Sequence, residues 1–136
     1  MSYLLDTNIC VHWLSGDMRI DARLKAVDPA NCYLSEVTEL EVLYGIANSS
    51  PTHRKTNQDR IPRLEMLFQD RILPIRPAFP HFAEQKANLR RTGRLVGDFD
   101  LLIGCTALAH DLTLVTRNVK DFVNLPGLRL ENWVDA

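Results

Sequence analysis

The sequence predicts an α/β fold in which a short parallel sheet of about five strands lies between two layers of helices. Short apolar runs alternate with helical stretches along the chain. Strands that alternate with helices form parallel sheets, because each helix returns the chain to the edge where the next strand begins. The chain has 136 residues, of which 46% are hydrophobic and 24% charged. These values are typical of one globular domain, which we expect to span residues 1–136.

The first half of the chain predicts strands at residues 3–5 and 32–34 and helices at residues 8–14, 19–27 and 36–47. The first helix ends near Ser15, and the second ends at Asp28 because a residue before a proline is pushed out of helical geometry. Ser35 is a good N-cap for the third helix. The polar segment 49–58, with Pro51 inside it, is either a loop or the exposed start of a long helix.

The second half predicts helices at residues 62–69, 79–91 and 98–110 and strands at residues 72–75, 112–115 and 128–130. Pro62 can occupy the first position of its helix. Pro74 places its strand at an edge or in an irregular position, because proline donates no backbone hydrogen bond. The run LTLV at 112–115 strongly favours a strand, and we expect it to lie centrally with residues 3–5. The last strand has the weakest pattern.

Composition narrows the class of protein. The three cysteines are far apart, which indicates reduced thiols in a cytoplasm rather than disulfides or a zinc site; they are Cys10, Cys32 and Cys105. The beginning MSYLLDTN does not resemble a signal peptide, and no apolar stretch approaches the roughly 20 residues of a membrane span. The net charge is −1, so any contact with nucleic acid must come from local basic clusters.

Two aspartates lie at positions where a catalytic or ligand-binding side chain is expected. Asp6 directly follows the first predicted strand, and ligands of open α/β sheets bind at the carboxyl ends of strands. Asp6 can also cap the next helix, although Thr7 can do the same. Asp100 lies in an almost wholly apolar helix, where an ionised group needs a partner or a metal. Asp98 is explained more simply as the N-cap of that helix.

Further polar residues leave alternatives open. Glu41 lies in the second turn of its helix, and the helical wheel does not distinguish it from Glu39. Thr116, Asn118 and Asp121 follow the strand at 112–115, although Asp121 can equally cap a short turn. Carboxylates without neighbouring histidine or cysteine favour Mg²⁺ or Mn²⁺ over Zn²⁺. The histidines show no metal-binding spacing, and we expect ordinary surface or core roles for His12, His53, His81 and His110.

Four segments together resemble the VapC toxins, which are PIN-domain ribonucleases: YLLDTNICV, SEVTELEVLYGI, VGDFDLLIGCTALAH and LTLVTRNVKDFVNLPGLRLENW. They occur in the family's order and spacing over essentially the whole chain. The resemblance implies a PIN-like three-layer fold and the toxin of a VapBC-type toxin–antitoxin system. It implies a metal-dependent endoribonuclease that hydrolyses RNA phosphodiester bonds to 5′-phosphate and 3′-hydroxyl ends, using one or two Mg²⁺ or Mn²⁺ ions.

Segment by segment, the resemblance implies catalytic, metal-binding acids at Asp6, Glu41 and Asp100. At the fourth position the chain departs from many members, because Asn118 stands where they have an acid. Other members use the acid three residues later, which is Asp121 here. Asn118 can still coordinate through its carbonyl, and Asp98 is a further candidate ligand. Supporting roles fall to Thr7, Asn8 and Thr116.

Basic residues near the expected pocket are candidates for guiding RNA, or else belong to solvated helix faces; they are Lys86, Arg90, Arg91, Arg94, Arg117 and Lys120. The resemblance also implies a bacterial cytoplasmic protein with a cognate VapB-like antitoxin, which would cover the toxin and direct a basic side chain at the acidic pocket. Homodimers are common in the family, and Trp13, Leu67 or Phe68 are candidates for such a contact.

Three other functions compete with this one. A haloacid-type phosphatase needs a second aspartate at the position of Asn8, and a receiver domain needs an acidic pair before Asp6. Neither requirement is met. A catalytically impaired PIN-like protein that binds RNA or regulates another protein is the remaining alternative. The neutral Asn118, at a position where many members have an acid, supports it.

Overall fold

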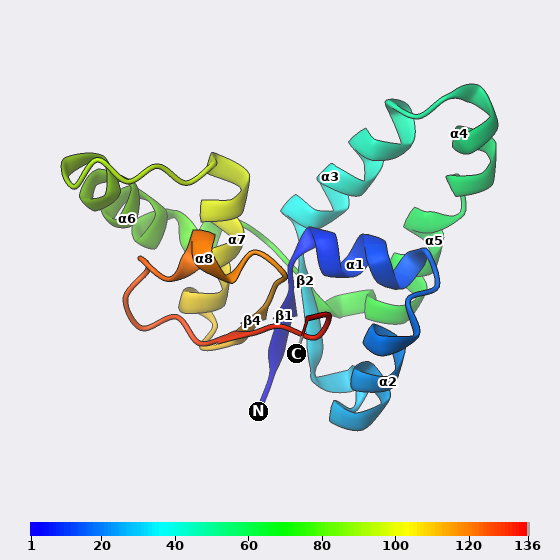
Figure 1. The fold of residues 1–136 in the computed structure, drawn as a ribbon, viewed down its shortest axis with the longest axis horizontal. Coiled ribbons are helices and arrows are strands. Elements are labelled where there is room, and N and C mark those ends of the chain that lie inside the picture. Colours follow the sequence, from blue (N-terminus) through cyan, green and yellow to red (C-terminus); the bar gives the residue numbers. More distant parts are fainter. Residues whose placement is uncertain (136) are drawn as a thin grey trace.

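The computed structural model describes residues 1–135, which form a five-stranded sheet with helices on both faces (Figure 1). The strand order is β3-β2-β1-β4-β5, and each neighbouring pair is parallel. The strands are β1 (Tyr3–Leu5), β2 (Cys32–Ser35), β3 (Ile72–Leu73), β4 (Thr113–Val115) and β5 (Leu130–Glu131). The predicted α/β class is confirmed, with β1 at the centre and β4 beside it.

The helices occupy the connections between these strands. They are α1 (Thr7–Leu14), α2 (Met18–Val27), α3 (Glu36–Ala47), α4 (Pro51–Asn57), α5 (Arg60–Phe68), α6 (Phe79–Arg91), α7 (Asp98–Ala109) and α8 (Val119–Phe122). Figure 1 shows α3 and α4 extending from one side of the sheet and α6 from the other. In residues 1–135, none of the helices has the length and apolar character needed to cross a membrane.

The two faces of the sheet bury separate hydrophobic cores, because successive side chains of a strand point to opposite faces. Leu5 belongs to the core under α1, α2 and α5, together with Ile9 and Phe68. Leu4 belongs to the opposite core under α6 and α7, together with Leu101. Both leucines of β1 are fully buried. The carboxyl end of β1 is therefore held from both sides.

Some boundaries differ from those that the sequence predicts. Residues 51–57 form a separate short helix, because Ser50 caps it and Pro51 takes its first position. Pro62 lies inside the first turn of α5 rather than at its first position. The last strand falls later than predicted, because parallel pairing sets Leu114 opposite Leu130. Strand β3 lies at the edge of the sheet and ends before Pro74, as expected.

Two predictions about single residues are wrong. Gly97, not Asp98, is the N-cap of α7. The Oδ1 atom of Asp98 instead accepts a hydrogen bond from Lys86 Nζ at 2.8 Å, and this ion pair joins α7 to α6. Phe68 is fully buried beneath the sheet, so it is not available for a dimer contact. Trp13 and Leu67 pack partly buried against the same core.

We expect the same substitution to have very different effects on stability at two helical glycines. A Cβ at Gly104 of α7 would lie 2.8 Å from Leu125 Cδ1 and 3.2 Å from Phe122 Cδ1, whereas a Cβ at Gly45 of α3 meets nothing within 4 Å. We expect Gly104→Val to destabilise the fold by about 1–3 kcal/mol through overpacking, and Gly45→Val to change it far less. Urea unfolding of the two variants measures this difference. Equal losses would show that the helix α7 packs less tightly than described.

Candidate active site

Asp6 lies at the carboxyl end of the central strand and is held by the strand next to it. The backbone N–H of Asp6 donates to the carbonyl of Val115 at 2.9 Å. Thr116 Oγ1 donates to Asp6 Oδ2 at 2.8 Å, and the Thr7 N–H donates to Asp6 Oδ1 at 2.8 Å. The Asp6 residue is only 3% exposed. Both carboxylate oxygens therefore have fixed positions at the edge of the sheet.

The same turn positions Glu41. Thr7 Oγ1 donates to Glu41 Oε1 at 2.7 Å and lies 3.0 Å from Thr38 Oγ1. This contact joins the start of α1 to the second turn of α3, so Glu41 faces the cavity beside Asp6. Glu39 lines a different cavity on α3. The tertiary contact thus separates two glutamates that helical periodicity does not distinguish.

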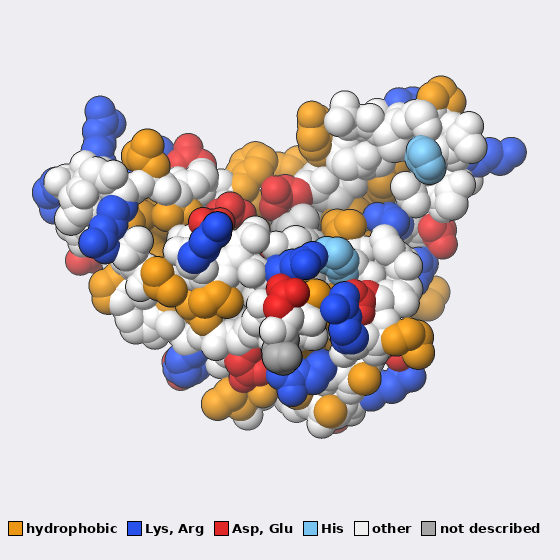
Figure 2. Space-filling view, in the orientation of Figure 1, with side chains coloured by type: hydrophobic (Ala, Val, Ile, Leu, Met, Phe, Trp, Pro, Cys, Tyr) orange, Lys and Arg blue, Asp and Glu red, His pale blue; other side chains and the backbone are white. Residues whose placement is uncertain are grey.

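A cavity of about 350 Å³ collects polar residues from several elements. Its lining residues are Asp6, Thr7, Asn8, Val11, His12, Glu41, Asp100 and Asn118. Figure 2 shows acidic side chains on the floor of a hollow between two raised lobes of the molecule. Asp121 is exposed and does not line this cavity. It also does not line the adjacent cavity, which is lined by Glu41, Asp98 and Asp100 among others. His12 also lines the cavity, although the sequence predicts an ordinary surface or core role for it. It lies one helical turn after Asn8, and helical spacing could have identified it.

Two carboxyl groups of this cavity, those of Asp6 and Asp100, have raised pKa values. Burial raises the pKa of Asp6 from 3.8 to about 6. The charges of Asp100 and Glu41 also raise this pKa, by smaller amounts, and the hydrogen bonds from Thr116 and Thr7 act in the opposite direction. Burial and the charge of Asp121 raise the pKa of Asp100. A cation bound among these groups would remove the repulsion and lower both pKa values.

The donors suit a hydrated Mg²⁺ or Mn²⁺ ion. Carboxylate and amide oxygens predominate among them, beside the hydroxyl of Thr7 and the imidazole of His12, and the buried Oδ1 of Asn8 has no hydrogen-bond partner within residues 1–135. In the same residues, no three Asp, Glu, His or Cys side chains converge closely enough to form a complete ligand cage. Mg²⁺ needs no such cage, because it is commonly held by one or two carboxylates and keeps several waters.

The basic residues predicted to guide RNA lie outside the acidic cavity. Arg117 pairs with Asp135, with Nε and Oδ2 3.0 Å apart. Arg94 Nη1 donates to Asn124 Oδ1 at 2.6 Å, and together with Arg90 it lines a separate, largely apolar cavity of about 280 Å³. The other candidates are exposed on the surface; they are Lys86, Arg91 and Lys120. Lys86 contacts an acid, Asp98, but none of the six residues lines the acidic cavity.

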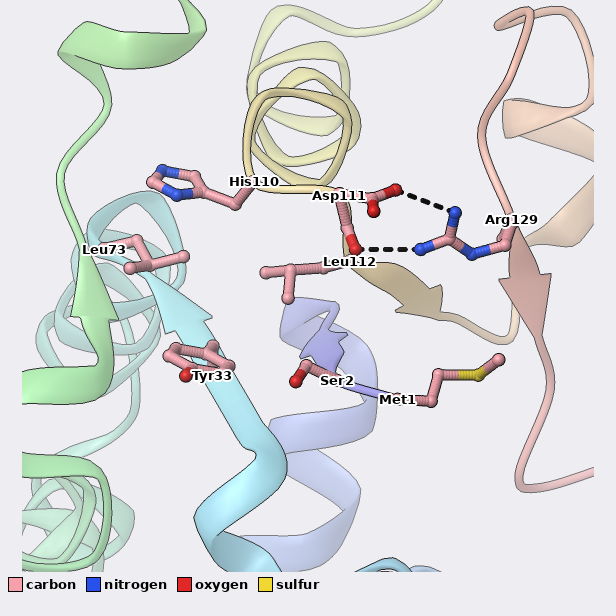
Figure 3. A pocket seen from close by; sticks show the side chains of 8 residues that line it. All are labelled: Met1, Ser2, Tyr33, Leu73, His110, Asp111, Leu112 and Arg129. Atoms are coloured by element: carbon pink, nitrogen blue, oxygen red, sulfur yellow. Dashed lines mark hydrogen bonds and ion pairs between the residues drawn. The ribbon is translucent and has the colours of Figure 1, made fainter.

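A larger cavity, of about 760 Å³, lies at the opposite edge of the sheet (Figure 3). Ser2 and Leu112 line it, and they precede β1 and β4. Figure 3 shows His110 beside Leu73 on one side and the pair formed by Asp111 and Arg129 on the other. Arg129 Nη1 donates to Asp111 Oδ1 at 2.8 Å. Ligands of parallel sheets bind at the carboxyl ends of strands, so the smaller acidic cavity is the better candidate.

Comparisons with known proteins agree with this architecture. Residues 3–128 match the family model described as PIN domain. The chain is 31% identical to Ribonuclease VapC2 of Rickettsia felis and 30% identical to the tRNA(fMet)-specific endonuclease VapC of Shigella flexneri, with 98% of each chain covered in both cases. It also superposes on the solved structure of VapBC2 from Rickettsia felis bound to a promoter DNA fragment, with a TM-score of 0.82 and 31% identity, over 98% of this chain and 99% of that one.

The raised pKa of Asp6 predicts how metal-free stability depends on pH. The unfolded chain ionises Asp6 near pH 3.8 but the folded chain only near 6, so the free energy of unfolding falls as pH rises through this interval. We expect Asp6→Asn to gain up to about 3 kcal/mol relative to the original chain by pH 7 and nothing comparable below pH 4. Thermal and urea unfolding with EDTA measure this gain. Adding Mg²⁺ should stabilise only the original chain. A stability difference between the two proteins that does not depend on pH would contradict the raised pKa of Asp6.

Proposed function

This chain belongs to the VapC branch of the PIN-domain family, and we propose from that premise that it is a Mg²⁺- or Mn²⁺-dependent endoribonuclease. The observation that carries the proposal is that Asp6, Glu41 and Asp100 all line one cavity at the carboxyl ends of the strands. These acids come from three distant segments of the chain, so their meeting is a property of the fold. Phosphodiester hydrolysis to 5′-phosphate and 3′-hydroxyl ends is the proposed reaction.

Asp6 and Asp100 would hold the cation, with Glu41 as third acid and the amide oxygens of Asn8 and Asn118 as further donors. When bound, Mg²⁺ or Mn²⁺ supplies the positive charge that activates a water for in-line attack and stabilises the departing oxygen. The chain's own residues set the geometry. Thr116 and Thr7 fix the two oxygens of Asp6, and the Thr7 hydroxyl orients Glu41.

For the fourth acid we propose Asp121. Its charge raises the pKa of Asp100, so its electrostatic influence reaches the cavity although its side chain does not line it. Asn118 does line the cavity but is neutral. Asp98 is a weaker candidate for a ligand, because its Oδ1 atom is already bound to Lys86.

The proposed biological role is that of a toxin held by a VapB-like antitoxin in a bacterial cytoplasm. The VapBC2 complex from Rickettsia felis supports such a partner. The acidic cavity would attract a basic side chain from the antitoxin in place of the cation. Free, buried cysteines at Cys10, Cys32 and Cys105 suit a reducing compartment. We also propose a homodimer, for which Trp13 and Leu67 remain candidate contacts.

The proposed activity predicts RNA cleavage that depends on Mg²⁺ or Mn²⁺ and stops with EDTA. Asp6→Asn, Asp100→Asn and Glu41→Gln should each lower the rate by orders of magnitude, because each removes charge from the cation site while keeping its size. Glu39→Gln is the matched control on the same helix and should be nearly silent. Gel analysis of a transfer RNA pool, including initiator tRNA, measures the rates. Cleavage that persists in EDTA would contradict the proposal, and metal-loaded protein without cleavage would favour an impaired RNA-binding or regulatory protein.

The assignment of the fourth acid to Asp121 predicts an order of effects among three substitutions. Asp121→Asn should weaken Mn²⁺ binding and cleavage more than Asn118→Ala, because it removes a charge that acts on Asp100 whereas Asn118 contributes only an amide dipole. Asp98→Asn should be milder than either, since Asp98 lies exposed beside Lys86. Calorimetric titration with Mn²⁺ and cleavage rates measure the order. A larger loss in Asn118→Ala would instead assign the fourth position to the amide.

A further inference from the structure

The acidic cavity continues into a second one. A neighbouring cavity of about 430 Å³ is lined by Glu41, Gly97, Asp98, Phe99 and Asp100. Glu41 and Asp100 line both cavities, so the two form one groove with the acids in its middle. His12 lines only the first of these two cavities and Phe99 only the second. A ligand held at the acids by one group therefore has room for its next group beside Phe99.

Phe99 is an unusual residue in its helix. The apolar side chains that follow it in α7 are largely buried; Leu101 is 1% exposed and Ile103 is fully buried. Phe99 is 47% exposed, in the first turn and next to Asp100. Gly97 precedes it without a side chain, which leaves the entrance of the cavity open. Core packing thus accounts for the helix but not for this aromatic ring.

The chemistry around Phe99 selects against a phosphate and for a nucleobase. Glu41 and Asp100 line the cavity outside any ion pair of the described residues, and their negative charges repel a bare phosphate, whereas the charge of Asp98 is offset by Lys86. A nucleobase is uncharged and flat, and its N–H groups can donate to carboxylates while its face stacks on an aromatic ring. In Asp98 only Oδ1 is bound to Lys86. The Oδ2 atom is free of hydrogen bonds within the described residues.

We propose that Phe99 is the stacking platform of a nucleobase subsite for single-stranded RNA, directly beside the acidic cavity. The proposal rests on the proposed endoribonuclease function and names what determines its choice of cleavage site. Guanine suits the subsite best, because its Watson–Crick edge presents neighbouring N–H donors to a carboxylate. Uracil presents one N–H between two carbonyl oxygens, which a carboxylate repels. Phe99 is a specificity residue and takes no part in bond breaking.

A fluorescent base tests the stacking directly. The probe is a uridine decamer with one central 2-aminopurine, whose emission is quenched on stacking, and the non-cleaving chain carries Asp6→Asn. We expect quenching on binding, its loss in Phe99→Ala, and its retention in Phe99→Trp. Affinity should fall by between about fivefold and about a hundredfold in Phe99→Ala. The matched control is Phe79→Ala, since Phe79 is 44% exposed but lies on α6 outside the groove, and it should behave like the parent.

Cleavage in the otherwise original chain separates this proposal from the function on which it rests. Phe99→Ala should raise KM and weaken the preference for guanine at the cut, with little change in kcat. If the original chain cleaves RNA with Mn²⁺ and Phe99→Ala matches it in KM, cut sites and quenching, the subsite is wrong and the function stands. If the original chain neither binds nor cleaves RNA, both fail. If Phe99→Ala weakens only the complex with an antitoxin, Phe99 belongs to a protein-docking surface and the subsite is overturned.

Discussion

The hydrogen bond from Thr116 to the buried carboxylate of Asp6 is the contact on which the acidic cavity depends. It joins the residue after β1 to the residue after β4 at 2.8 Å, where parallel pairing already sets Leu5 opposite Val115. Burial of Asp6 is unfavourable for its charge, and the two hydrogen bonds that it accepts only partly offset this. A bound cation would complete the compensation. The buried carboxylate is therefore under electrostatic strain that a metal would relieve.

Thr7 extends this arrangement from the sheet to a helix. Its backbone N–H binds Asp6 and its hydroxyl binds Glu41, so one residue fixes two carboxylates from distant parts of the chain. The sheet underneath is rigid because both of its faces are packed: Leu4 lies in one core and Leu5 in the other. Rigid support matters for charged groups of the same sign, which would otherwise move apart into water.

Local negative charge also shapes the surroundings of the site. The chain is nearly neutral, with a net charge of −1, and Arg117 and Arg94 are engaged with Asp135 and Asn124 rather than lining the cavity. Under the proposed function, a backbone phosphate would approach the acids with a cation between them. The groove beyond Asp100 offers the aromatic ring of Phe99, beside Asp98 in its ion pair with Lys86. Base stacking would then contribute more to such contacts than long-range attraction.

The sequence alone determined the α/β class, the parallel sheet and its central strand, because alternation of apolar runs and helices is a local property of the chain. It also identified Asp6 and Asp100 as candidates, since one ends a strand and the other interrupts an apolar helix. Helical periodicity did not distinguish Glu41 from Glu39; the family resemblance indicated Glu41, and the tertiary structure gives the physical reason, the hydroxyl of Thr7. It likewise replaced the capping role of Asp98 by an ion pair with Lys86. Such contacts join residues far apart in the chain, and helical or strand periodicity carries no information about them.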